Sequence, residues 1–214
     1  MIINSLIKCI FIIKIVFNQD KYFFMKTLIF DLDGTLVDCK KLHQDGFRWA
    51  VTHQCPGITY ADEEVEGLPT TAKIKYLQNK GYDVTIAVDD LKKEHTRAHI
   101  NEYVKYNKEL ADHFTRLYTK YKLCLASNSR SEFVFKCMNI LQLWQFECVY
   151  TRDYGPAKPN PWMYNECMRI TNNTPSNTVI FEDSLVGIEG AMLTGATVIA
   201  VADSKDLIEK LYEF

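Results

Sequence analysis

Short apolar runs alternate with amphipathic stretches along most of this chain. A short apolar run between polar residues is typical of a buried strand, and apolar residues three or four positions apart are typical of a helix. Strands that alternate with helices indicate right-handed βαβ units, and hence a parallel sheet covered on both faces. The expected strands are 27–30, 122–126, 148–150, 178–181 and 197–201, with helices at 109–121, 131–143, 161–170, 185–193 and 206–212.

Residues 39–108 have a different pattern, with helical spacing and no convincing strand. Leu42, Phe47 and Val51 lie at helical intervals in the first segment, which Pro56 and the glycine after it end. The sequence therefore predicts an all-helical insert in an α/β protein. Its helices are expected over 40–54, from a capping Thr70 or Thr71 to Gly81, and over 88–106.

Residues 1–24 do not match the rest of the chain. Residues 2–17 are rich in Ile, Leu and Phe, but two lysines interrupt them, and the run is shorter than the roughly 20 residues that span a bilayer. No small-residue cleavage site follows. We expect no stable membrane insertion and interpret these residues as an N-terminal extension upstream of a natural start at Met25; a membrane-surface anchor is the alternative.

The composition and net charge of the chain argue against a nucleic acid as its binding partner. The chain has 214 residues, of which 47% are hydrophobic and 24% charged, which is ordinary for a globular protein. The formal net charge is -2, and there is no long basic run of the kind that binds nucleic-acid phosphates. The seven cysteines are scattered and form no C-x-x-C pair, which favours reduced thiols over a disulfide framework or a zinc site. We expect a cytoplasmic monomer without a nucleic-acid partner.

The most unusual polar pattern follows the first expected strand, where Asp31 and Asp33 precede Gly34. Residues two apart on a strand point to the same face, so the two carboxylates would share one space. Close carboxylates raise each other's pKa unless a cation lies between them. Gly34 would allow a sharp turn. The plain interpretation is an acidic strand-to-loop turn; the functional one is a magnesium and phosphate site with an aspartate nucleophile.

Polar residues also follow three other expected strands. Ser127 and Asn128 follow the second strand, Lys158 lies beyond the third, and Glu182 and Asp183 follow the fourth. Each feature alone is ordinary, as a helix cap or a solvated lysine. Ligands of open parallel sheets bind beyond the carboxyl ends of the strands, so all these side chains would surround one crevice. The set suits a hard divalent cation and a phosphoryl group.

This ordered set resembles the haloacid dehalogenase-like (HAD) superfamily. Its four motifs, D-x-D-G-T, S/T, K and E/D-D, correspond to residues 31–35, Ser127, Lys158 and residues 182–183. Residues 181–188 also resemble the fourth motif of the subgroup that includes phosphoglycolate phosphatase and β-phosphoglucomutase. The resemblance implies a Rossmann-like core of residues 25–38 and 109–214, with a helical cap of residues 39–108.

The resemblance implies a role for each motif residue. Asp31 would attack phosphorus and form an aspartyl-phosphate. Asp33 would protonate the leaving oxygen and then activate water. Ser127, Asn128 and Lys158 would hold the phosphoryl oxygens, and Lys158 would offset charge in the transition state.

The resemblance also implies Mg²⁺ as cofactor. Asp31, the backbone carbonyl of Asp33, and Asp183 would hold it, with Glu182 close by, and the cation would screen the nucleophile from the charge of the phosphate. The substrate is expected to be a small phosphorylated metabolite. The candidate substrate contacts in the cap are His43, Gly67 and Thr70.

We therefore expect a Mg²⁺-dependent phosphatase that hydrolyses a small phosphate monoester. Asp33 argues against a dehalogenase, which would lack the second acid. A sugar-phosphate mutase is the alternative: His43 and Gly67 match its pattern, whereas Pro69 and Thr70 stand where that pattern has Ser and Arg. A non-catalytic binding module is disfavoured because the motif residues are intact. Action on nucleic-acid phosphate ends lacks a basic track.

Overall fold

The computed structural model describes residues 25–65 and 68–214, and these form two compact units. One unit comprises the described residues up to Leu36 together with Asn107–Phe214, and the other comprises those of Val37–Tyr106. The expectations for residues 1–24 and for Gly67 lie outside the described residues. No helix within the described ranges has the length and apolar character that crossing a bilayer requires.

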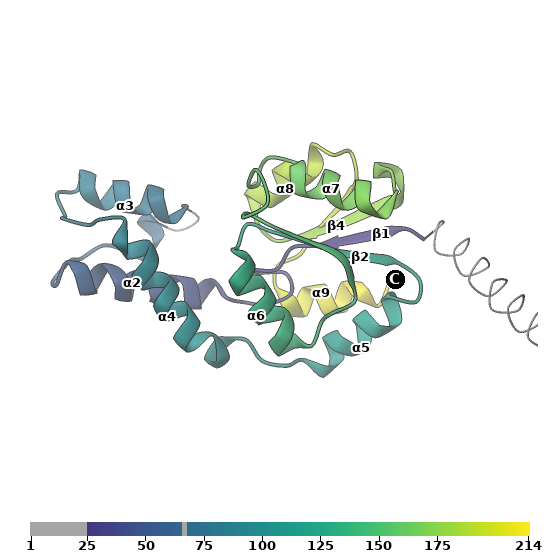
Figure 1. The fold of residues 1–214 in the computed structure, drawn as a ribbon, viewed down its shortest axis with the longest axis horizontal. Helices are drawn as coiled ribbons and strands as arrows, with labels where there is room; N and C mark the ends of the chain where they lie inside the picture. The colour runs from purple at the N-terminus through teal and green to yellow at the C-terminus, as the bar shows by residue number, and fades with distance from the viewer. Residues whose placement is uncertain (1–24, 66–67) are drawn as a thin grey trace, which may run out of the picture. The chain divides into compact units, whose positions relative to one another are not determined.

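The larger unit is built on a five-stranded parallel sheet with strand order β3-β2-β1-β4-β5 (Figure 1). Every residue of the central strand β1 is buried, as expected for a parallel strand that is covered on both faces. The prediction of an α/β protein with a Rossmann-like parallel sheet and an inserted helical segment is confirmed. The strands are β1 (Thr27–Phe30), β2 (Lys122–Ser127), β3 (Phe146–Thr151), β4 (Thr178–Glu182) and β5 (Thr197–Ala200).

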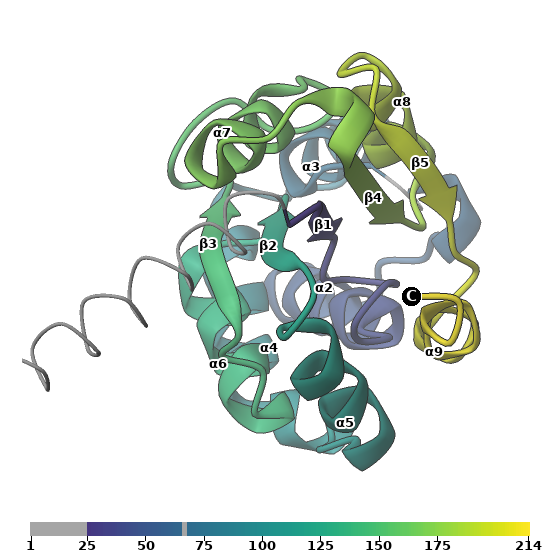
Figure 2. The same ribbon diagram turned by 90° about the vertical axis from the view of Figure 1, so that its right-hand side faces the viewer.

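Helices cover both faces of this sheet. Helices α7 and α8 lie on one face, and α5, α6 and α9 lie on the other (Figures 1 and 2). The central strand contributes to both layers: Ile29 packs with Met163 of α7, and Phe30 contacts the ring of Phe114 of α5. The helices are α5 (Lys108–Leu117), α6 (Ser131–Leu141), α7 (Trp162–Thr171), α8 (Leu185–Met192) and α9 (Ser204–Leu211).

Local caps explain where helix ends differ from the predicted ones. Helix α6 ends at Leu141 because Gln142 adopts the left-handed conformation, with φ of 58°. Helix α9 begins at Ser204 because the Asp203 side chain accepts a hydrogen bond from the backbone N–H of Asp206. Side-chain capping and left-handed residues end a helix at positions that apolar periodicity does not reveal.

The register of the strands aligns their carboxyl ends. Thr27 of β1 pairs with Lys122 of β2 and with Thr178 of β4. The pairing continues to the end of β1, where the backbone N–H of Asp31 donates to the carbonyl of Phe181 at 3.0 Å. The residues that follow β1, β2 and β4 therefore emerge at one edge of the sheet.

The smaller unit is helical, with its own apolar core. Phe47 and Val51 of α2 pack with Ile74 and Leu77 of α3. Helix α3 begins at Thr70, but no threonine side chain caps it, so the predicted threonine cap is wrong; Pro69 occupies the cap position. The role of this unit as a cap stays a prediction. Its helices are α2 (Lys40–Gln54), the short 3₁₀ helix η1 (Asp62–Glu64), α3 (Thr70–Asn79) and α4 (Ala87–Tyr103).

The central strand should be the most sensitive part of the core. Ile29→Ala removes a fully buried side chain, and we expect it to lower the free energy of unfolding by about 2–5 kcal/mol. Ile170→Ala, at a position of α7 that is 47% exposed, is the matched control and should change it by about 0.5 kcal/mol or less. Urea denaturation followed by circular dichroism measures both. Equal losses would show that the sheet centre does not limit stability.

Candidate active site

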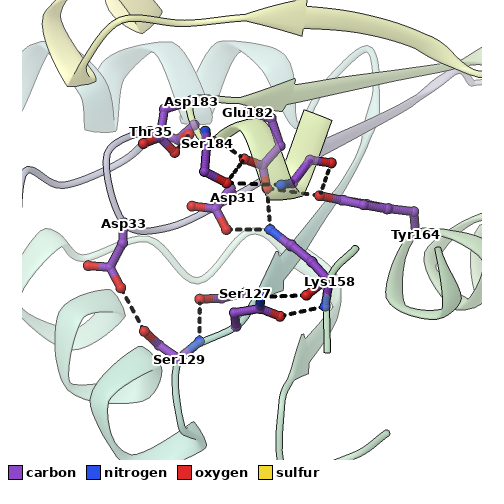
Figure 3. A network of polar contacts seen from close by, with 12 residues as sticks. Asp31, Asp33, Thr35, Ser127, Ser129, Lys158, Tyr164, Glu182, Asp183 and Ser184 are labelled. Carbon is purple, nitrogen blue, oxygen red and sulfur yellow. Dashed lines mark hydrogen bonds and ion pairs between the residues drawn. The ribbon is translucent and has the colours of Figure 1, made fainter. Parts of the chain in front are cut away.

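The aligned strand ends bring together the four polar features that were predicted from the sequence (Figure 3). Asp31 follows β1, Ser127 ends β2, and Glu182 ends β4. Lys158 comes from the segment between β3 and α7. All four residues are buried. Asp31 and Glu182 are 151 positions apart in the chain, but the aligned strand ends place all four residues around one site within the larger unit.

Lys158 lies at the centre of this site. Its Nζ is 2.5 Å from Oδ1 of Asp31 and also forms an ion pair with Oε1 of Glu182. Burial lowers the pKa of Lys158, but the two carboxylates outweigh that effect and raise it above its usual value. Lys158 is therefore an ammonium ion. The carboxamide of Asn128 holds its backbone, since Oδ1 accepts from the N–H of Lys158 at 2.8 Å and Nδ2 donates to its carbonyl at 3.3 Å.

One ammonium does not balance the carboxylates around it. Oxygens of Asp31, Glu182 and Asp183 lie within 4.8 Å of one another. Burial raises the pKa of Asp31, Lys158 opposes this rise, and Glu182 adds to it. Burial, followed by the charge of Glu182, raises the pKa of Asp183 to about 6. A second positive charge beside these oxygens would relieve the repulsion.

The donor set fits Mg²⁺. It consists of hard carboxylate oxygens, which are the ligands that this ion prefers. The chain also approaches Asp183 closely, because a Cβ built on Gly34 would lie 2.0 Å from its Oδ2. Gly34 has φ of 86°, a conformation that side chains disfavour. Thr35 donates to the other oxygen of Asp183 at 3.3 Å.

Asp33 is held separately from Asp31. Its Oδ2 accepts a hydrogen bond from Oγ of Ser129 at 2.6 Å, whereas Asp31 binds Lys158 (Figure 3). Strand β1 ends at Phe30, so both aspartates lie beyond it, and the expectation that their carboxylates share one space stays a prediction. The backbone N–H of Ser129 in turn donates to Oγ of Ser127 at 3.1 Å. The turn after β2 therefore positions Asp33 through a side chain.

Glu182 is saturated with hydrogen bonds in addition to its ion pair. The hydroxyl of Tyr164 is 2.8 Å from its Oε1, and Ser184 donates to Oε2 through both its backbone N–H and its hydroxyl. Ser184 also caps α8 by accepting from the N–H of Gly187 at 3.0 Å. Sequence reasoning missed Tyr164 as part of the site, because a tyrosine in an amphipathic helix looks like any core aromatic residue.

The candidate substrate contacts outside the larger unit stay predictions. His43 lies in α2 and is half-buried. Thr70 is the first residue of α3, where Nζ of Lys92 lies 3.5 Å from its hydroxyl oxygen. Gly67 is outside the described residues. The phosphate contact of Asn128 also stays a prediction, and its observed partner is Lys158.

The fold and the strand-end carboxylates define a class of hydrolases. Residues 28–201 match the profile of the haloacid dehalogenase-like hydrolase family. The chain belongs to this family, and it is therefore an enzyme of the hydrolase class.

Curated relatives and solved structures agree with this assignment. The chain is 25% identical to a phosphorylated carbohydrates phosphatase from Thermotoga maritima, over 86% of this chain and 91% of the relative. It is 24% identical to the pyrophosphatase PpaX from Halalkalibacterium halodurans, over 80% of each chain. The crystal structure of β-phosphoglucomutase from Clostridium difficile shares the fold, with a TM-score of 0.69, 19% identity, and coverage of 86% and 87%.

The close packing of α8 against Glu182 gives a test of the site. A Cβ built on Gly187 would lie 2.1 Å from the Glu182 carboxylate. Gly187→Ala should therefore destabilise the protein and lower its activity, although Ala is favoured over Gly in a helix by about 1 kcal/mol. Val186→Ala, at an exposed neighbouring position of the same helix, is the control. Thermal unfolding and turnover check both variants, and a stabilised, active Gly187→Ala would contradict the observed packing.

Proposed function

We propose that this protein is a Mg²⁺-dependent phosphatase that hydrolyses a small phosphate monoester through a phosphorylated Asp31. The observation that carries the proposal is the buried contact between the Asp31 carboxylate and the Lys158 ammonium, in a cluster where the carboxylates of Asp31, Glu182 and Asp183 outnumber this one cation. A carboxylate can approach a phosphate dianion only where cations offset the repulsion. The curated relatives named as phosphatases support this reaction class.

In the first step, a carboxylate oxygen of Asp31 forms a bond to phosphorus while the bond from phosphorus to the ester oxygen breaks. Asp33, as the carboxylic acid, gives its proton to the departing oxygen. The charge of Lys158 favours the carboxylate form of Asp31, against the effect of burial on its pKa, and then stabilises charge on the phosphoryl oxygens. The Ser127 hydroxyl, buried beside the site, donates a hydrogen bond to the same oxygens.

In the second step, Asp33 takes a proton from water, and the resulting hydroxide attacks the phosphorus of the acyl phosphate. Inorganic phosphate leaves, and Asp31 is regenerated as a carboxylate. The bond from Ser129 keeps the Asp33 side chain in place through both steps. Asp31, Asp183 and the Asp33 carbonyl would hold Mg²⁺, with Glu182 close by, and the bound ion would neutralise negative charge on the phosphoryl group.

Substitution of Asp31 and substitution of Asp33 should reduce activity to different extents. Asp31→Asn should abolish release of phosphate from an aryl phosphate, because no nucleophile remains. Asp33→Asn should lower kcat by roughly 10²–10⁴-fold, which is the usual contribution of general acid–base catalysis. Asp38→Asn, at an exposed aspartate, is the control and should retain activity. Steady-state kinetics checks all three, and an active Asp31→Asn would overturn the covalent mechanism.

Activity should depend on a divalent cation that Asp183 helps to bind. Removal of metal with a chelator should abolish turnover, and added Mg²⁺ should restore it. Asp183→Asn should raise the Mg²⁺ concentration needed for half-maximal activity, because a neutral amide replaces a carboxylate ligand. Asp112→Asn, with a largely exposed side chain, should leave that concentration unchanged. Full activity after chelation, with no metal left by elemental analysis, would contradict the proposal.

A screen of small phosphate esters separates phosphatase from mutase. Sugar phosphates, phosphoglycolate and nucleoside monophosphates with Mg²⁺ are the first panel, since the relative from T. maritima is named for phosphorylated carbohydrates. A phosphatase releases inorganic phosphate without a primer. Turnover that requires a sugar 1,6-bisphosphate would instead assign the protein as a mutase.

A further inference from the structure

Three of the scattered cysteines meet in the core of the larger unit. Cys124 lies on β2, Cys148 on β3 and Cys167 on α7, and their Sγ atoms all lie within 4.8 Å of one another. The Sγ atoms of Cys124 and Cys148 are 3.5 Å apart, and all three thiols are free. Figure 2 shows β2 and β3 side by side, with α7 packed over one face of the sheet that they form. None of the three belongs to the carboxylate site.

A β-bulge in the pairing of β2 with β3 brings the cysteines of these two strands together. Leu123 pairs with Phe146, but the next residue of β2, Cys124, pairs with Cys148, so Glu147 is an extra residue in β3. A regular register would place Glu147 opposite Cys124 and would turn Cys148 to the other face, because the side-chain period of a strand is two. The bulge at Glu147 therefore puts both thiols on the face that α7 covers.

We propose that Cys124, Cys148 and Cys167 form a second metal site, which takes one thiophilic d¹⁰ cation through three thiolates. In a zinc–thiolate site the metal–sulfur distance is about 2.3 Å, which places neighbouring sulfurs about 3.8–4.0 Å apart. The Cys124 and Cys148 sulfurs are 3.5 Å apart, and the other two separations are no more than 4.8 Å, so coordination needs only small side-chain movements. Soft thiolate ligands select cations such as Zn²⁺, Cu⁺ and Cd²⁺ over Mg²⁺.

The surroundings allow a cation to enter and protons to leave. Cys124 and Cys167 are fully buried, but Cys148 is half-buried and lies on the edge strand of the sheet. Interaction with the Cys124 and Cys167 thiols lowers the pKa of Cys148, which favours its thiolate. Each thiol that is still protonated gives its proton to solvent as its sulfur binds the cation.

Titration of the reduced full-length protein with Cd²⁺ tests the site, in excess Mg²⁺ that keeps the carboxylates occupied. The wild type should bind one Cd²⁺ per chain at this site, with a sulfur-to-cadmium charge-transfer band and three sulfur neighbours by X-ray absorption. Cys148→Ser should weaken binding by about tenfold or more, since even outer-shell partners of a metal site contribute ten- to a hundredfold. Cys55→Ser, at a half-buried cysteine of the helical unit, is the matched control.

A wild type without the charge-transfer band would overturn the proposal, as would a Cys55→Ser variant that loses as much affinity as Cys148→Ser. A measurement on the unaltered chain covers the case in which Cys148→Ser does not fold. Bound Cd²⁺ should slow alkylation of Cys148 by iodoacetamide, measured residue by residue with mass spectrometry, and leave the rate at Cys55 unchanged. Equal alkylation rates at Cys148 with and without Cd²⁺ would contradict the proposed metal site.

Discussion

The buried ion pairs of Lys158 constrain much of the site around them. Removing an ammonium and a carboxylate from water costs several kcal/mol per ion, so such groups persist only where each is paired and hydrogen-bonded. Asn128 accepts a hydrogen bond from the backbone N–H of Lys158, and the hydroxyls of Tyr164 and Ser184 donate hydrogen bonds to the Glu182 carboxylate. The beginning of α8 is shaped by the same need, because its third residue must be a glycine to admit the carboxylate. Local structure on three elements thus follows from one buried cation.

The register of the parallel sheet places these charged side chains together at one edge. In-register pairing of β1 with β2 and β4 brings their carboxyl ends to one edge, where backbone and side-chain groups are free to bind a ligand. Three carboxylates face one ammonium there, and this excess of negative charge favours a further cation. Asp33 is held through the hydroxyl of Ser129, whereas Asp31 is paired with Lys158. In the proposed mechanism, these different partners suit Asp31 to attack on phosphorus and Asp33 to proton transfer.

Element order and most of the site were readable from the sequence for a physical reason. A parallel strand that is covered on both faces must be a continuous apolar run, so each polar residue that ends one marks the binding edge. Asp31, Ser127, Lys158 and Glu182 were found in this way. The ends of α6 and α9 were missed because single capping residues set them. Tyr164 was missed because its hydroxyl acts at a contact that only packing creates.

The alternation of strands and helices, the resemblance to the family, and the order of the polar strand ends were all predictable without the structure, because each expected element and each motif is a short local pattern of residues. The tertiary structure decided which distant side chains meet. It gave Asp33 a serine partner, and it gathered Cys124, Cys148 and Cys167 through one extra residue in β3. Those contacts depend on strand register and helix packing, which no local pattern of apolar and polar residues encodes.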